Sequence, residues 1–87
     1  MIDQERFENH RHSIRNQREI LASSRCGCFY CLKTYSPKEI QSWVTEFDID
    51  TALCPHCGID AVLGDASGLT ITREFLHSMH LFWFREP

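Results

Sequence analysis

Four of the five cysteines form two matched Cys-x-x-Cys pairs, Cys28 with Cys31 and Cys54 with Cys57, and 22 residues separate the pairs. A two-residue gap lets both thiolates of a pair reach one ion at about 2.3 Å. Soft thiolates in a tetrahedron suit zinc, which has no redox chemistry of its own. The spacing therefore predicts one zinc ion held by Cys28, Cys31, Cys54 and Cys57.

A site of four cysteines is closed, whereas a catalytic zinc keeps one position open for water. We therefore expect a structural metal whose binding energy becomes folding energy, and no enzymatic activity. An iron–sulfur centre on the same thiolates and a thioredoxin-like redox pair are weaker alternatives. A zinc deaminase is excluded, because it needs His-x-Glu ahead of Pro-Cys-x-x-Cys, and here Pro55 follows Cys54 and no His-x-Glu occurs.

Cys26 is the unpaired cysteine. It could replace Cys28 as a ligand, but its five-residue offset from Cys31 makes a poorer loop. We expect Cys26 to be a free thiol.

The five histidines do not predict a second metal site. His56 lies inside the second cysteine pair, where a loop residue usually faces solvent. His77 and His80 lack a nearby third ligand, and His10 and His12 are two apart on a predicted helix and cannot converge.

Length and composition fit one small globular domain. A chain of 87 residues often needs a staple such as a metal, and 43% hydrophobic with 24% charged residues argues against disorder. No apolar run reaches the roughly 18 residues of a membrane span, and residues 1–5 do not resemble a signal peptide. We expect a cytoplasmic protein, where cysteines bind metals more often than they form disulfides.

The pattern of elements predicts an α+β fold with a helical arm over residues 1–25 and a zinc-binding domain over residues 26–87. The arm reads as one helix over residues 3–22, with Asp3 as its N-cap. Its apolar face is thin, because only Phe7, Ile14 and Leu21 recur every seven residues. Such a face must dock, either on the zinc-binding domain or in a dimer contact.

Within the zinc-binding domain, residues 32–35 and 51–53 read as short strands. The run Ser36-Pro37-Lys38-Glu39 is typical of a helix start, so we expect a helix from Pro37 to about Val44 and a loop from Thr45 to Asp50. Residues 59–63 are apolar and fit either a helical turn or a strand, and residues 64–68 fit a turn.

The final helix is expected from Ile71 to about Phe84, capped by Thr70. One face is predicted to carry Ile71, Phe75, Met79 and Phe82, joined by Leu76 and Trp83. Leu81 and Phe84 fall to the side of this face. Because exposed aromatic patches usually mark interfaces, we expect a homodimer built on the final helix or on the arm.

Charge separates the two parts of the chain. Residues 1–25 hold five arginines against four acids, whereas residues 26–87 hold four basic residues against eight acids. Nucleic-acid binding needs a concentrated positive surface, which the zinc-binding region lacks. Binding through Arg11, Arg15 and Arg18 of the arm remains the alternative function, although we interpret these arginines as the polar face of the arm, opposite Phe7.

Three segments resemble small uncharacterised bacterial cytoplasmic proteins: Cys-Phe-Tyr-Cys at 28–31, Tyr-Ser-Pro-Lys-Glu-Ile at 35–40 and Ala-Leu-Cys-Pro-His-Cys-Gly-Ile-Asp at 52–60. The Gly-Asp-Ala-Ser-Gly turn and the aromatic final helix fit as well, so the resemblance spans about residues 26–84. It implies a zinc-binding fold and no known activity.

The layout of knuckle, short strands, second knuckle and helix also resembles a treble clef. The HNH nucleases of that group carry Asp-His-Ile near such knuckles, but here Ile59-Asp60-Ala61 has alanine where the histidine would stand. A degenerate HNH-like nuclease is therefore the least favoured function. The preferred interpretation is a non-enzymatic interaction module with structural zinc and a protein partner.

Overall fold

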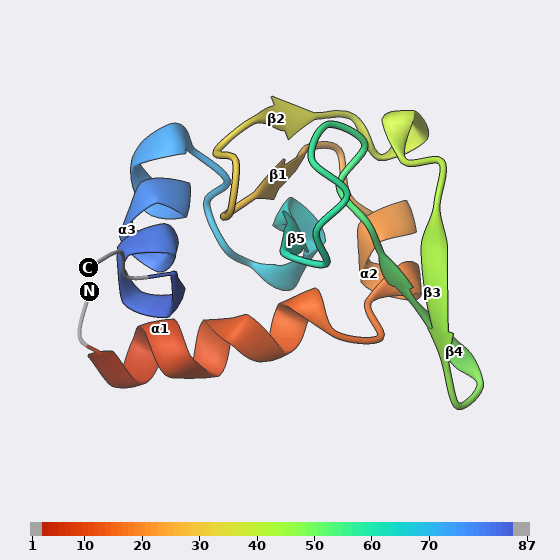
Figure 1. The fold of residues 1–87 in the computed structure, drawn as a ribbon, viewed down its shortest axis with the longest axis horizontal. Coiled ribbons are helices and arrows are strands. Elements are labelled where there is room, and N and C mark those ends of the chain that lie inside the picture. The colour runs from red at the N-terminus through yellow and green to blue at the C-terminus, as the bar shows by residue number, and fades with distance from the viewer. Residues whose placement is uncertain (1–2, 85–87) are drawn as a thin grey trace.

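The computed structural model describes residues 3–84 as an α+β fold. Its regular elements follow the chain in this order: helix α1 (Asp3–Asn9), 3-10 helix η1 (His10–Ser13), helix α2 (Gln17–Leu21), strands β1 (Cys26–Cys28) and β2 (Thr34–Tyr35), 3-10 helix η2 (Pro37–Glu39), strands β3 (Trp43–Glu46), β4 (Ile49–Ala52) and β5 (Val62–Gly64), 3-10 helix η3 (Asp65–Ser67) and helix α3 (Arg73–Trp83). Helix α3 and the β3–β4 hairpin lie at opposite ends of the molecule (Figure 1).

A three-stranded antiparallel sheet of order β2-β1-β5 forms the centre of the molecule. Strand β1 lies between its neighbours, with Cys26 opposite both Tyr35 and Gly64. Every residue of β1 is buried. At Gly27 an added Cβ would lie 2.6 Å from Leu76 Cδ1, so glycine is what lets β1 approach the last helix this closely.

The arm is not one helix, and this expectation was wrong. Helix α1 continues as η1, the chain then breaks at residues 14–16, and α2 starts at Gln17. Arg15 adopts a φ of 46°, which an α-helix cannot include. Because of the break, Phe7, Ile14 and Leu21 do not form a buried seam, and all three are exposed.

Asn16 explains the break in the arm, since its buried side chain joins three segments. Its Nδ2 donates to the Val62 carbonyl at 2.9 Å and to the His12 carbonyl at 3.0 Å, and its Oδ1 accepts from the Ala52 amide at 3.0 Å. The neighbouring Arg15 amide donates to Thr51 Oγ1 at 2.7 Å. These polar contacts replace the helical bonds that a continuous arm would have made.

The arm docks on α3 within the same chain. Trp83 is the centre of this contact: its ring lies 5.7 Å from the Phe7 ring and 4.2 Å from the His10 ring, between centroids. Its indole Nε1 donates to the Arg6 carbonyl at 3.1 Å. The arm therefore packs within its own chain, as one of the two expected arrangements required, but through Phe7 and His10 and not through the predicted apolar face as a whole.

The segment after Tyr35 differs from its prediction. The capping box is present, because Ser36 Oγ accepts from the Lys38 amide and Glu39 accepts from the Ser36 amide. It caps only the 3-10 turn η2, however, and the predicted helix to Val44 does not form. Strands β3 and β4 instead make a hairpin through a two-residue loop, in place of the expected loop from Thr45 to Asp50.

The final helix is close to its prediction, although it starts later. Thr72, and not Thr70, is the N-cap, and its Oγ1 accepts from the Phe75 amide at 3.1 Å. Leu76 and Met79 are fully buried, as the amphipathic pattern requires. Residues 59–63, left open between helix and strand, lead into β5.

The core lies between the three-stranded sheet, α2, α3 and the cysteine loops. Its buried apolar members are Ile20, Cys26, Cys28, Phe29, Tyr35, Ile40, Ala52, Cys54, Ala61, Val62, Leu63, Ile71, Leu76 and Met79. No helix within residues 3–84 has the length and apolar character to span a membrane.

Candidate metal centre

The first cysteine pair is the turn between β1 and β2. Strand β1 ends at Cys28, and the chain folds back so that the Leu32 amide donates to the Cys28 carbonyl at 2.8 Å. The Cys28 amide donates to the Lys33 carbonyl at 3.0 Å, which closes the turn. Inside it, the Tyr30 amide donates to Cys28 Sγ at 3.3 Å.

The second cysteine pair repeats this pattern between β4 and β5. The Gly58 amide donates to the Cys54 carbonyl at 2.9 Å, and the Cys54 amide donates to the Ile59 carbonyl at 2.9 Å. The His56 amide donates to Cys54 Sγ at 3.4 Å. Each pair therefore has the backbone turn of a metal knuckle, in which a backbone N–H points at the first sulfur. We call these turns the first and the second knuckle.

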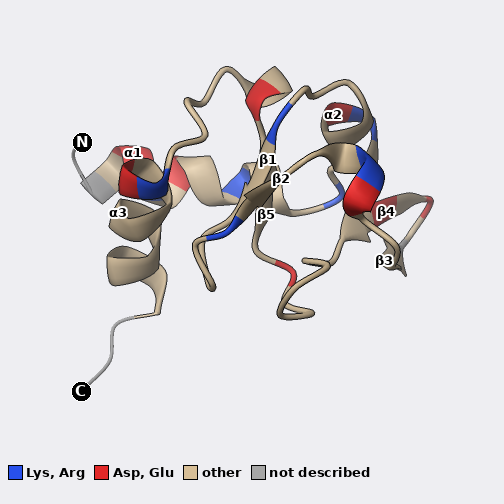
Figure 2. Ribbon diagram, turned by 90° about the horizontal axis from the view of Figure 1, so that it is seen from above, with Lys and Arg blue, Asp and Glu red and all other residues tan. Residues whose placement is uncertain are grey.

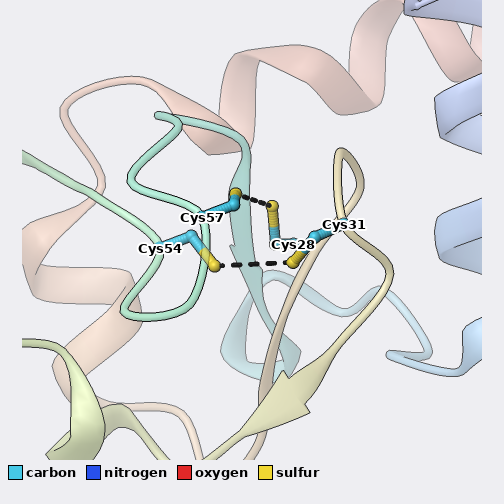
Figure 3. A group of neighbouring side chains, drawn as sticks. All are labelled: Cys28, Cys31, Cys54 and Cys57. Atoms are coloured by element: carbon cyan, nitrogen blue, oxygen red, sulfur yellow. Dashed lines mark hydrogen bonds between the residues drawn. The ribbon is translucent and has the colours of Figure 1, made fainter.

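The two knuckles face each other and bring all four sulfurs together (Figure 3). The four Sγ atoms lie within 4.8 Å of one another. Across the knuckles, Cys28 Sγ is 3.7 Å from Cys57 Sγ, and Cys31 Sγ is 3.7 Å from Cys54 Sγ. A tetrahedron with metal–sulfur bonds of about 2.3 Å has edges of about 3.8 Å. The four cysteines thus fit one tetrahedral metal ion.

Burial of the four cysteines is uneven. Cys28 and Cys54, the first residues of the knuckles, are 0% and 3% exposed, whereas Cys31 and Cys57 are partly exposed. The cluster is therefore packed into the core on one side and reaches the surface on the other.

The surroundings separate the thiols by acidity. Burial raises the pKa of Cys28, against the opposing effect of backbone amides such as that of Tyr30. Burial acts on Cys54 in the same direction, but the Tyr35 hydroxyl and the Cys57 and His56 amides favour its thiolate, so that its pKa falls to about 7. Cys54 consequently gives up its proton more readily than Cys28.

Cys26 lies outside this group. It is free and fully buried in β1, and its pKa is raised to about 12, first by burial and then by the charge of Asp65. The structure thus places Cys28, and not Cys26, with the other three sulfurs.

The histidines make other contacts. His56 is exposed, and its ring centroid lies 5.5 Å from that of Tyr35, while His77 is exposed on α3. His10 packs against the Trp83 ring, His12 contacts the Glu19 carboxylate, and His80 lies within hydrogen-bonding distance of the Phe29 carbonyl. Among residues 3–84, no histidine belongs to a cluster able to bind a metal.

Two residues of the site were not found by the sequence reasoning. Tyr35 is 6% exposed and lies against the cysteine cluster, where its hydroxyl affects Cys54. Leu32 has a φ of 69° directly after the first knuckle. Alternation along residues 32–35 indicated a short strand, which forms as β2, but no local signal placed Tyr35 against the second knuckle.

Comparison with known proteins does not place the chain in a family. No family model matches it, and no curated protein or solved structure is significantly similar to it. The interpretation of the site therefore depends on its own geometry and donor set.

Proposed function

We propose that this chain is a small zinc-binding protein whose metal is structural and whose role is to present a stable surface to another protein. One observation carries the proposal: four cysteine sulfurs from two knuckles lie at the spacing of a zinc tetrahedron. Four thiolates complete the coordination of zinc and leave no position for substrate or water.

The position of the knuckles supports a structural role. The first belongs to the central sheet, and the second lies on the connection between the β3–β4 hairpin and β5. One ion bound to both would tie these segments together, and in a domain of this size such a staple adds much of the stability. Two knuckles, short strands and a final helix also support a treble-clef-like arrangement, although β5 and η3 precede the helix.

An interaction role is favoured over an enzymatic one. The position where an HNH nuclease would carry its histidine is Ala61, which is 1% exposed and whose carbonyl accepts from the Phe29 amide at 3.0 Å. The surface, by contrast, carries large apolar side chains that a protein partner could cover: Phe7, Ile14, Leu21, Tyr30, Val44, Phe47, Ile49 and Leu81. The reducing cytoplasm would keep four such thiols available for metal.

Nucleic-acid binding through the arm gains no support from the positions of its arginines. The break at residues 14–16 separates Arg11 from Arg18, and Arg15 lies 5.7 Å from the Phe47 ring centroid. Arg6 lies over Phe82 and donates to Ser78. Figure 2 shows basic and acidic residues interspersed along the ribbon.

Metal analysis of the purified protein tests the proposal. We expect about one zinc per chain, and unfolding when a chelator removes it. Cobalt-substituted protein should show the spectrum of a four-thiolate tetrahedron, and added azide should leave that spectrum unchanged because no position is open. Cys28→Ser should lose the metal, whereas Cys26→Ser should keep it.

Metal-free protein that keeps its circular dichroism spectrum would contradict the structural role. A cobalt spectrum that responds to azide would instead indicate an open, catalytic type of site.

A further inference from the structure

The Tyr35 hydroxyl is a buried polar group with no hydrogen-bond partner. The residue is 6% exposed. Among the buried side-chain oxygens and nitrogens described within residues 3–84, its hydroxyl is the one without a hydrogen bond. Buried hydroxyls almost always find a partner, because leaving one unpaired costs its full desolvation energy. The position of this hydroxyl therefore requires an explanation.

The backbone directs Tyr35 at the metal centre. Strand β2 pairs with β1 so that Tyr35 lies opposite Cys26, two residues before the first ligand of the first knuckle. From there its ring reaches the second knuckle, where its centroid is 5.5 Å from that of His56, between Cys54 and Cys57. One side chain thus extends from the sheet that carries the first knuckle to the second knuckle.

The effects on its pKa agree with this position of the hydroxyl at the cysteine cluster. Burial raises the pKa of Tyr35 most, and the next contributions come from Cys54, followed by Cys28 and Cys31. No hydrogen bond joins the hydroxyl to Cys54 Sγ in this structure, but of the three cysteines that act on the hydroxyl, Cys54 has the largest effect.

We propose that the Tyr35 hydroxyl donates a hydrogen bond to the metal-bound thiolate of Cys54 and so controls how tightly the centre holds its ion. The inference rests on the proposed zinc-binding function and names a positioning residue for that site. Metal binding requires the deprotonated sulfur, which is a far better acceptor than a thiol. A hydrogen bond to a ligand fixes its orientation and tunes its donor strength.

The substitution Tyr35→Phe separates this role from simple packing, because it removes one oxygen and keeps the ring. A hydroxyl without a partner lowers stability, so its removal would strengthen the fold and leave metal affinity unchanged. A hydroxyl that donates to Cys54 has the opposite effect: its removal weakens zinc binding, by about tenfold for a contact of this kind.

The experiment measures zinc affinity by competition with a coloured chelator, on wild-type, Tyr35→Phe and Tyr30→Phe proteins. Tyr30 is the matched control, since it lies in the first knuckle but is 41% exposed. We expect about one zinc in all three proteins and weaker binding in Tyr35→Phe alone. In the cobalt forms, the sulfur-to-cobalt charge-transfer band should move to lower energy in Tyr35→Phe, because a thiolate without its donor is richer in electrons.

Equal affinity and an unchanged band in Tyr35→Phe would overturn the inference while leaving the zinc site intact. A wild-type protein without zinc would instead overturn the proposed function. If Tyr35→Phe does not fold, magnetic resonance of the wild-type protein loaded with cadmium-113 decides. A slowly exchanging Tyr35 hydroxyl proton coupled to the metal supports the hydrogen bond, and a rapidly exchanging, uncoupled proton refutes it.

Discussion

Leu32 and Gly58 occupy equivalent positions in the two knuckles. Each directly follows the second cysteine of its pair, and each donates its amide to the carbonyl of the first cysteine. Both have left-handed backbone angles, with φ of 69° at Leu32 and 79° at Gly58. The same turn is thus built once with the residue that tolerates this conformation and once with a residue that is strained by it.

Gly58→Ala should destabilise the zinc-loaded protein by about 1 kcal/mol, because alanine resists positive φ. No atom would lie within 4 Å of the new Cβ, so the effect comes from the backbone alone. Urea unfolding measures it. Gly68→Ala is the control. Gly68 has a φ of 90°, and an added Cβ there would also have no atom within 4 Å, but the residue lies outside both knuckles.

Both alanine variants should lose similar stability, but only Gly58→Ala should release zinc faster to a chelator. Equal zinc release from the two variants would show that the knuckle conformation does not control the metal site.

The local features of this chain were predictable because they depend on residues close in sequence. Two-residue spacing fixes how each cysteine pair turns, and the capping box depends only on Ser36 and Glu39. The final helix has a strong enough apolar stripe to be recognised, and Leu76 and Met79 are buried as expected. In each case the decisive contacts lie within a few residues.

The arm and the hairpin were mispredicted because long-range contacts decide them. Asn16 reads as an ordinary polar helix residue until its partners at Ala52 and Val62 are known. The β-forming residues Trp43 and Val44 were a signal for the hairpin, but the preceding capping box outweighed it. The hairpin loop gave no turn signal, because its residue with positive φ is Phe47 and not glycine or asparagine.

Asn16→Ala should cost about 2–3 kcal/mol or more, because it leaves the Ala52 amide and the Val62 carbonyl buried without partners. Thermal or urea unfolding of the zinc-loaded protein measures the loss. Gln17→Ala, at the adjacent and only half-buried position, should stay within about 0.5 kcal/mol of wild type. A loss of stability as small in Asn16→Ala as in Gln17→Ala would mean that the hydrogen bonds of Asn16 do not hold the arm in place.

Lowering the pH should release zinc and unfold the protein together. An unperturbed thiol with a pKa of 9.0 is protonated at neutral pH, and burial raises that of Cys28 further, so zinc binding displaces protons. The zinc-bound fold holds fewer protons than the metal-free unfolded chain, and its stability must therefore fall as the pH falls.

Tryptophan fluorescence and a zinc indicator, followed through an acid titration, measure this release. By mass action, excess zinc should move the midpoint to lower pH. An acid midpoint that does not change with zinc concentration would show that acid unfolds the protein through groups other than the cysteines.

We also expect self-association through the final helix, and the exposure of its side chains indicates which residue the contact would cover. Phe84 is half-buried, with its ring centroid 5.7 Å from that of Phe29 and 5.0 Å from that of Tyr30. Leu81 remains 56% exposed on α3. We therefore expect a homodimer that covers Leu81, and sedimentation at micromolar concentrations should show a mass that rises with concentration.

Leu81→Glu should give a monomer with unchanged stability, because a charge at the contact opposes association while the side chain supports no core packing. Phe47→Glu is the matched control. Phe47 is 86% exposed, but it lies in the hairpin at the other end of the molecule, so this change should leave the dimer intact (Figure 1). A wild-type monomer over the whole concentration range would refute the dimer. A dimer that dissociates in Phe47→Glu but not in Leu81→Glu would show that the interface lies at the hairpin.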